Sequence, residues 1–300
     1  MTNNPAFSLS ELPQGESMRY VNCNLCSADE IRSVTVQNNY MAVQCRRCGL
    51  VYANPRPAPE ALIELYNTYH QRNGKVSETW ETLMDRNFRE ISALLGLMRP
   101  GKGRLLDIGC GYGHFVELMQ RHGWAASGIE PSGNAAACAQ AKGLDVRRMA
   151  IESAQFPDSS FDAITAFYVL EHLFDPLGVL KKILAMLKPG GVLVLRIPHT
   201  TPIVKLLNMF GIKNNLYDLP FHLYDFSPAT IRLLLEKAGF CGIKITPGCP
   251  TMPPRRAERI VTLFSGTVAR LLFSLSGENF LLPGVSKTVI SVKPLETRGD

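Results

Sequence analysis

Strand-like and helix-like apolar patterns alternate along the middle of the chain. The run 104–108 is short and apolar, as expected for a buried parallel strand, and apolar positions at helical spacing follow from Phe115. This alternation predicts a parallel sheet with right-handed crossovers. Further strand patterns lie at residues 126–129, 145–149, 161–167 and 192–199, and an amphipathic helix is predicted over 176–187.

The C-terminal third adds a helix and two more strands. Ser227 and Pro228 are a typical N-cap and first-turn residue for a helix that ends at Gly239. The segments 241–246 and 288–292 predict an antiparallel pair that completes the sheet. The predicted fold class is therefore α/β, a Rossmann-like, doubly wound sheet of seven strands.

An insertion, residues 247–287, separates these two strands. It contains Arg255, Arg256 and Arg259 close together. The amphipathic run 260–272 beside them can pack on the body of the protein, on a second subunit or on a membrane surface. A peripheral membrane or lipid-linked substrate contact through residues 255–282 is one of these expectations.

Four cysteines near the N-terminus have the spacing of a metal site. Cys23 and Cys26 form one C-x-x-C knuckle, and Cys45 and Cys48 form another after eighteen intervening residues. This spacing fits a tetrahedral, all-thiolate zinc site, and alternating apolar residues between the knuckles predict strands, hence a small zinc ribbon. Four thiolates leave no open coordination position, so the zinc would be structural. A pair of disulfides is the alternative.

The proline-rich stretch 54–59 is stiff and non-helical, which marks a domain boundary. We expect an N-terminal arm and ribbon over 1–55, a linker with lid helices over 56–100, and the main domain over 101–300. The helix predicted over 78–98 has a continuous apolar face, and packing of that face on the sheet is its expected role.

The composition is that of a globular protein. Of 300 residues, 46% are hydrophobic and 19% charged, and the net charge of +6 is too mild to indicate a nucleic-acid partner. The N-terminus lacks the basic and apolar regions of a signal peptide. No stretch reaches the ~18 uncharged apolar residues of a membrane-spanning helix. We therefore expect a cytoplasmic protein with reduced thiols.

A glycine-rich turn follows the run 104–108. Asp107 is followed by Gly109, Gly111 and Gly113, which lets the backbone approach a ligand, although the dinucleotide pattern G-x-G-x-x-G is not met. Glu130 ends the next strand, twenty-one residues after Gly109. A carboxylate at this position can accept hydrogen bonds from both ribose hydroxyls of a nucleoside.

The motifs LDIGCGYG, GIEPS, FDAITAFYVLEHL and LKPGGVLVLRIP occur here in that order. The series resembles the class I S-adenosylmethionine-dependent methyltransferases, closely over residues 100–200 and loosely beyond. The resemblance implies S-adenosylmethionine as cofactor, its methionine half positioned by Asp107 and the glycine turn and its ribose by Glu130. Family members often have an acidic residue near the adenine amino group; here Ala150 and Ile151 occupy that region, so Glu152 is the expected neighbour.

Three histidines follow the predicted strands: His172, His199 and His222. Ligands sit at the carboxyl ends of the strands in open α/β sheets, and imidazole suits proton transfer near neutral pH. The hypothesis is that His222 is the general base and that His172 and Tyr224 orient the acceptor. The alternative for each histidine is a hydrogen-bonded structural residue.

The zinc ribbon joined to this core is similar to sugar methyltransferases that act on nucleotide-linked deoxysugars. Their loop reads roughly YHEHLSYFS, and residues 219–227 read LPFHLYDFS, so Leu219 and Phe221 replace a tyrosine and a glutamate. Tyr69-His70 resembles the lid sequence of that family. The resemblance implies O- or C-methylation of a small-molecule or glycan-linked acceptor, such as a sugar nucleotide or a lipid-linked sugar.

Three alternatives stay open. One is a quinone or lipid O-methyltransferase. Another is a ribosomal-RNA methyltransferase that uses the ribbon for recognition. The ribbon offers Arg32, Arg46 and Arg47 against Asp29 and Glu30, which is sparse for an RNA-binding surface. The last is a cofactor-binding subunit without turnover.

Overall fold

A computed structural model describes residues 18–62, 76–248, 267–269, 271–276, 281 and 286–295. The expectations for the arm 1–17, for the lid residues Tyr69 and His70, and for most of the insertion 247–287 lie outside these residues. Among the helices described, none combines the length and the apolar character needed to cross a bilayer.

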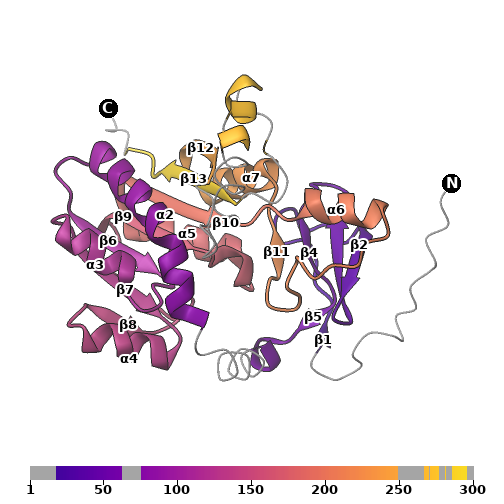
Figure 1. The fold of residues 1–300 in the computed structure, drawn as a ribbon, viewed down its shortest axis with the longest axis horizontal. Helices are drawn as coiled ribbons and strands as arrows, with labels where there is room; N and C mark the ends of the chain where they lie inside the picture. The colour runs from indigo at the N-terminus through magenta and orange to yellow at the C-terminus, as the bar shows by residue number, and fades with distance from the viewer. Residues whose placement is uncertain are drawn as a thin grey trace.

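A seven-stranded sheet forms the body of the protein, as predicted (Figure 1). Its order is β12-β13-β10-β9-β6-β7-β8. Strands β8, β7, β6, β9 and β10 run parallel to one another, and β13 runs antiparallel to both of its neighbours, β10 and β12. The strands are β6 (Arg104–Ile108), β7 (Ala125–Glu130), β8 (Val146–Arg148), β9 (Phe161–Phe167), β10 (Leu187–Ile197), β12 (Cys241–Pro247) and β13 (Lys287–Val292). β10 starts earlier than predicted, with a register shift between Leu187 and Val192.

Helices cover both faces of the sheet, which explains why its central strands read as continuous apolar runs. One face packs on α2 (Val76–Met98), α3 (His114–Arg121) and α4 (Gly133–Ala141), the other on α5 (Pro176–Met186) and α7 (Pro228–Ala238). Along β10, Val194 faces the first group and Leu195 the second. Helix α2 packs on the sheet as expected, with Phe88 against Phe167 at a ring-centroid distance of 5.2 Å.

The predicted caps of α7 are present. Ser227 Oγ accepts the Thr230 N–H at 3.2 Å, and Thr230 Oγ1 accepts the Ser227 N–H at 2.8 Å. This reciprocal pair is a capping box, and it satisfies two amide donors that the helix itself cannot pair. Gly239 ends the helix with φ +102°, a conformation that favours glycine.

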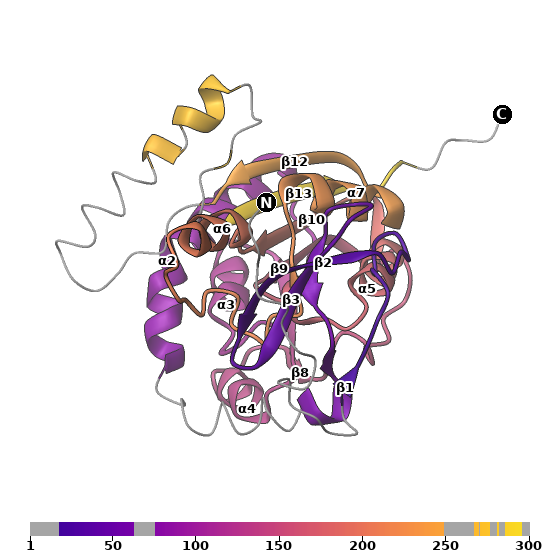
Figure 2. The ribbon, with the colours of Figure 1, turned by 90° about the vertical axis from the view of Figure 1, so that its right-hand side faces the viewer.

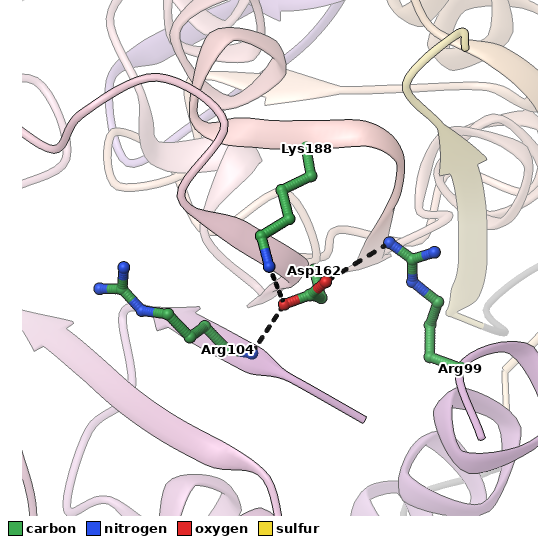
Figure 3. Close-up of polar contacts among 4 residues, drawn as sticks. All are labelled: Arg99, Arg104, Asp162 and Lys188. Atoms are coloured by element: carbon green, nitrogen blue, oxygen red, sulfur yellow. Dashed lines mark hydrogen bonds and ion pairs between the residues drawn. The ribbon is translucent and has the colours of Figure 1, made fainter. Parts of the chain in front are cut away.

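A carboxylate at the amino end of the sheet ties three elements together (Figure 3). Asp162 on β9 accepts hydrogen bonds from Lys188 Nζ at 2.7 Å and from the Arg104 backbone N–H at 2.9 Å, and the Arg99 guanidinium lies 3.8 Å away. Burial raises the Asp162 pKa, but these hydrogen bonds and charges outweigh it and leave the pKa below its ordinary value. This cluster lies at the opposite end of the strands from the candidate site, so its role is structural.

The N-terminal ribbon is a second, smaller sheet of four strands in the order β11-β4-β3-β2 (Figure 2). It contains β2 (Ile31–Gln37), β3 (Tyr40–Cys45), β4 (Val51–Ala53) and β11 (Tyr224–Asp225), while β1 (Met18–Arg19) pairs with β5 (Arg56–Pro57). The fourth strand comes from the far side of the sequence, because Tyr224 pairs with Tyr52 and Asp225 with Val51. The ribbon therefore holds the loop that contains His222, a connection with no signal in the local sequence.

Two further elements complete the site region. The 3-10 turn η2 (Leu170–His172) follows β9, and α6 (Thr201–Met209) follows β10. The sequence analysis predicted neither. Both lie at the carboxyl ends of parallel strands, where open α/β sheets bind ligands.

Candidate active site

The glycine turn adopts backbone conformations that side chains rarely allow. Gly109, Gly111 and Gly113 have φ values of +69°, +55° and +80°. A Cβ at position 109 would lie 2.6 Å from Val169 Cγ2, and one at position 113 would lie 2.5 Å from Leu144 Cδ1. The turn needs glycine for both reasons: strain and lack of space.

Glu130 locks the turn to the end of β7. Its Oε2 accepts the Gly111 N–H at 3.0 Å and its Oε1 the Ser132 N–H at 2.8 Å. The turn also donates to β7 directly, from Gly109 N to Ile129 O at 2.8 Å. Because each carboxylate oxygen can accept more than one hydrogen bond, Glu130 is held in place and keeps capacity for ligand hydroxyls.

Asp107 lies beneath the turn with 2% of its surface exposed. Its Oδ1 accepts a hydrogen bond from Thr165 Oγ1 at 2.6 Å. Burial raises its pKa to about 7, the Thr165 hydrogen bond works against that rise, and the negative charge of Glu130 adds to it. The structure thus brings Asp107, the glycine turn and Glu130 together, as the sequence analysis expected.

This pKa gives a testable pH dependence. An acid whose pKa rises on folding binds more protons in the native state, so it costs stability as the pH rises from 3.8 to about 7. We expect Asp107→Asn, which mimics the protonated acid, to gain stability relative to the wild type by on the order of 2 to 3 kcal/mol between pH 5 and pH 8. Urea unfolding of both proteins at the two pH values measures this; a pH-independent difference would contradict the assignment.

Glu152 is hydrogen-bonded to α5 and not to the group of Asp107, the glycine turn and Glu130. It follows β8 with its side chain exposed, and its carbonyl oxygen accepts a hydrogen bond from Lys182 Nζ at 2.8 Å. The neighbouring Ile151 is buried. A role for Glu152 near adenine stays a prediction.

The structure brings two of the three histidines into ring contact. His172 ends η2 and His222 lies before β11, with ring centroids 4.7 Å apart and planes at 72°. His172 Nδ1 lies 3.0 Å from the carbonyl oxygen of Phe221, and because a carbonyl oxygen can only accept, Nδ1 carries the proton of this hydrogen bond. Burial lowers the pKa of His222 to about 4, against the opposing charge of Asp225, so its imidazole is neutral at pH 7.

Glu171 joins this pair, and the sequence analysis did not select it. Its side chain is fully buried, and neither carboxylate oxygen has a hydrogen-bond partner in the described part of the chain. Ligand atoms of Glu171, His172 and His222 all lie within 4.8 Å of one another, close enough to share a cation. Burial raises the Glu171 pKa to about 8, with the charge of Lys287 lowering it, so the carboxyl is largely protonated at pH 7.

Lys287 and His199 extend the buried polar cluster. Lys287 is fully buried, donates to the carbonyl oxygen of Pro198, and has its pKa lowered by burial to about 8. His199 has an Nδ1 without a partner among the described residues, and burial together with the Lys287 charge lowers its pKa to about 4. Sequence reasoning missed Lys287, whose position depends on the pairing of β13 with β10.

The loop before β11 is fixed from two sides. The Leu223 N–H donates to Glu171 O at 2.8 Å, and the Leu223 carbonyl accepts the Ala53 N–H at 2.9 Å. The hydroxyl of Tyr224 accepts from Arg56 Nη1 at 2.8 Å and donates to Phe174 O at 3.2 Å. These contacts place Tyr224 at the junction with the ribbon, and its orienting role at the acceptor stays a prediction.

The four ribbon cysteines converge on one point. Cys23 Sγ lies 3.4 Å from Cys48 Sγ, Cys26 Sγ lies 3.5 Å from Cys45 Sγ, and all four sulfurs fall within 4.8 Å of one another. In each knuckle the residue four positions after the first cysteine, Ser27 or Gly49, has a positive φ and donates its N–H back to that cysteine's carbonyl. This arrangement fits a tetrahedral thiolate site for zinc.

Comparison with known proteins identifies relatives of this chain. A family model described as a methyltransferase domain matches residues 78–244. The ubiquinone biosynthesis O-methyltransferase of Xanthomonas axonopodis pv. citri is 33% identical over 153 residues, 47% of this chain and 64% of that protein. The enzyme of the same name from Aeromonas salmonicida is 32% identical over 148 residues, which are 45% of this chain and 62% of that enzyme. The match therefore spans less than two thirds of these relatives.

Among solved structures, one from Thermotoga maritima has the same fold. It is a S-adenosylmethionine-dependent methyltransferase described as a possible histamine N-methyltransferase. It superposes with a TM-score of 0.51 at 19% identity and covers 75% of this chain and 98% of its own.

Proposed function

The chain belongs to the methyltransferase-domain family as a class I S-adenosylmethionine-dependent methyltransferase, and we propose that it methylates a hydroxyl group of a small-molecule acceptor. The observation that carries this proposal is the group of Glu171, His172 and His222 at the carboxyl end of β9, in which Glu171 is buried and the two histidines are half-buried. It offers the neutral imidazole of His222, whose pKa is lowered by burial, for proton removal from a hydroxyl.

The cofactor site lies on the neighbouring strand ends. Glu130, already oriented by Gly111 and Ser132, binds the ribose hydroxyls, and Asp107 with the glycine turn positions the methionine half. The Gly109 backbone lies against Val169, whose Cγ2 would be 2.6 Å from a Cβ at position 109, and Val169 is three residues before His172. Cofactor and acceptor positions are therefore adjacent. S-adenosylmethionine, when bound, supplies a methyl group activated by its sulfonium.

The chain's own residues handle the proton. His222 accepts it from the acceptor hydroxyl as the oxygen becomes bonded to the methyl carbon, and His172 orients the same hydroxyl. Glu171, protonated near neutral pH, donates a hydrogen bond to the acceptor or to an imidazole. In-line positioning in a closed site contributes as much as proton transfer to such a displacement.

Two acceptor classes follow from separate observations. The four-cysteine ribbon and the loop 219–227 resemble sugar methyltransferases, which supports a nucleotide-linked or lipid-linked sugar. The names of the curated relatives support a phenolic hydroxyl of a quinone precursor. RNA is disfavoured because Arg32 bonds Gln44 Oε1 at 2.6 Å and Arg46 bonds the Ile31 carbonyl at 3.1 Å, so these ribbon arginines are engaged within the ribbon.

The ribbon cysteines hold a structural zinc ion in this proposal. Their geometry fits, and all four are free thiols that can ligate as thiolates. Thiols persist in the reducing cytoplasm, which is the compartment we propose for this protein.

A labelled-methyl transfer assay tests the function. The zinc-loaded protein is incubated with methyl-labelled S-adenosylmethionine and, separately, a sugar nucleotide, a lipid-linked sugar, a demethylated quinone precursor and ribosomal RNA. We expect label in one of the first three, and in none when Glu130→Ala abolishes cofactor binding. Label in RNA alone, or in no acceptor despite cofactor binding, would overturn the proposal.

A further inference from the structure

An exposed apolar surface covers α6 and the loop that follows it. Five large apolar side chains within eleven residues are 44–73% exposed. We call them the α6 patch: Leu206, Met209, Phe210, Ile212 and Leu216. Such clustering is unusual on a soluble surface and marks an interaction site.

The patch is rigidly presented. Val204 anchors α6 in the core, and Asn208 Nδ2 donates to the Val34 carbonyl of the ribbon at 3.3 Å. After the helix, Gln37 of the ribbon donates to Asn214 Oδ1 at 2.9 Å. Because the ribbon holds the inner side, the apolar side chains point outward in a fixed arrangement.

Two lysines lie within the segment that contains the patch. Residues 200–217 include Lys205 and Lys213, both exposed, and no aspartate or glutamate, and the half-buried Asp218 follows them. Apolar side chains rimmed by lysines match an anionic bilayer surface, where the chains enter the headgroup region and the ammonium groups meet phosphates. Protein interfaces are instead depleted in lysine and enriched in arginine and tyrosine.

A second group of exposed apolar side chains supports contact with a bilayer. Leu271 and Leu275 are 57% and 75% exposed on the short helical piece 271–275. Figures 1 and 2 both place this piece and α6 in the upper half of the molecule. The sequence analysis predicted membrane contact through residues 255–282, of which 255–266 lie outside the described residues.

We propose that the α6 patch docks this enzyme on an anionic lipid bilayer. Hydrogen bonds join the start of α6 to the proposed acceptor site. Asp225, close to His222 in the chain, accepts the Thr200 N–H at 3.1 Å and the Thr201 N–H at 2.7 Å. Docking places the acceptor site beside the membrane surface, so the acceptor is dissolved in or attached to lipid. This statement about the acceptor rests on the proposed methyltransferase function; bilayer binding does not.

Vesicle co-sedimentation tests the proposal on the full, zinc-loaded chain. One vesicle type is phosphatidylcholine alone, and the other is equal parts phosphatidylcholine and phosphatidylglycerol. We expect binding to the anionic vesicles, weakened by salt, and at least about a tenfold loss of affinity in the double variant Met209→Ser/Phe210→Ser. Leu97→Ser, at a side chain 81% exposed on α2, is the matched control and should bind like the wild type.

Three results would overturn the inference. They are equal binding by the wild type and the double variant, no binding to anionic vesicles, and a monodisperse dimer in light scattering that the double variant converts to monomer. The methyl-transfer assay with a water-soluble acceptor separates the two proposals. A protein that methylates that acceptor but does not bind vesicles keeps its proposed function and loses the docking surface.

Discussion

Replacing His222 with alanine should lower kcat by about a hundredfold to ten-thousandfold, the range typical for loss of a general base. The imidazole is held by ring contact with His172 and is neutral at pH 7 because burial lowers its pKa. Single-turnover kinetics with labelled S-adenosylmethionine measure the rate, and calorimetry measures cofactor affinity. The affinity should stay unchanged, since Glu130 and the glycine turn lie on other strands.

The pH profile distinguishes a base from a packing residue. Wild-type kcat should fall as the pH drops toward about 4, because a protonated imidazole accepts no proton. It should fall again above about 8, where Glu171 ionises and Lys287 loses its charge. His222→Ala should lose the acidic limb and keep the basic one. His122→Ala is the control, because His122 lies away from the site and its Nδ1 is 2.6 Å from Ser92 Oγ. Wild-type turnover in His222→Ala would end the assignment.

The sheet was predictable because its signals are local. A strand buried on both faces needs a continuous apolar run, and the run 161–167 matched β9 in full. The turn after β6 needs glycine where φ is positive and a Cβ would clash, so the motif could be read without the structure. The prediction of a seven-stranded sheet rested on such patterns, and the structure confirms it.

The rest of the site depends on contacts between distant segments. Glu171 stands next to His172 in the sequence, but its burial without a partner arises from the loop that covers it. Lys287 enters the site only because β13 pairs with β10. A two-residue strand such as β11 has no periodicity, so its pairing with β4 has no sequence signal.

The pairing of β11 with β4 joins the ribbon to the proposed acceptor site. β4 bonds β11 along its length, and Ala53 bonds the carbonyl of Leu223, next to His222. At the hairpin between β2 and β3, Asn38 Nδ2 donates to the Leu219 carbonyl at 2.9 Å. The ribbon thus holds the segment 219–225 at both of its ends. A ribbon of this size has little core of its own, so we propose that its fold depends on a metal ion bound by the four cysteines.

The double variant Cys45→Ser/Cys48→Ser should therefore lose the ribbon and, with it, acceptor turnover. Structural zinc contributes about 10–16 kcal/mol of apparent binding energy in small domains. We expect loss of the stoichiometric zinc by elemental analysis, a fall in kcat of about a hundredfold or more as His222 loses its position, and cofactor affinity within about twofold because the sheet is independent. Cys241→Ser, at an exposed cysteine on β12, is the control and should keep both zinc and activity. A zinc-free variant with wild-type kcat would show that the sheet and η2 position His222 without the ribbon.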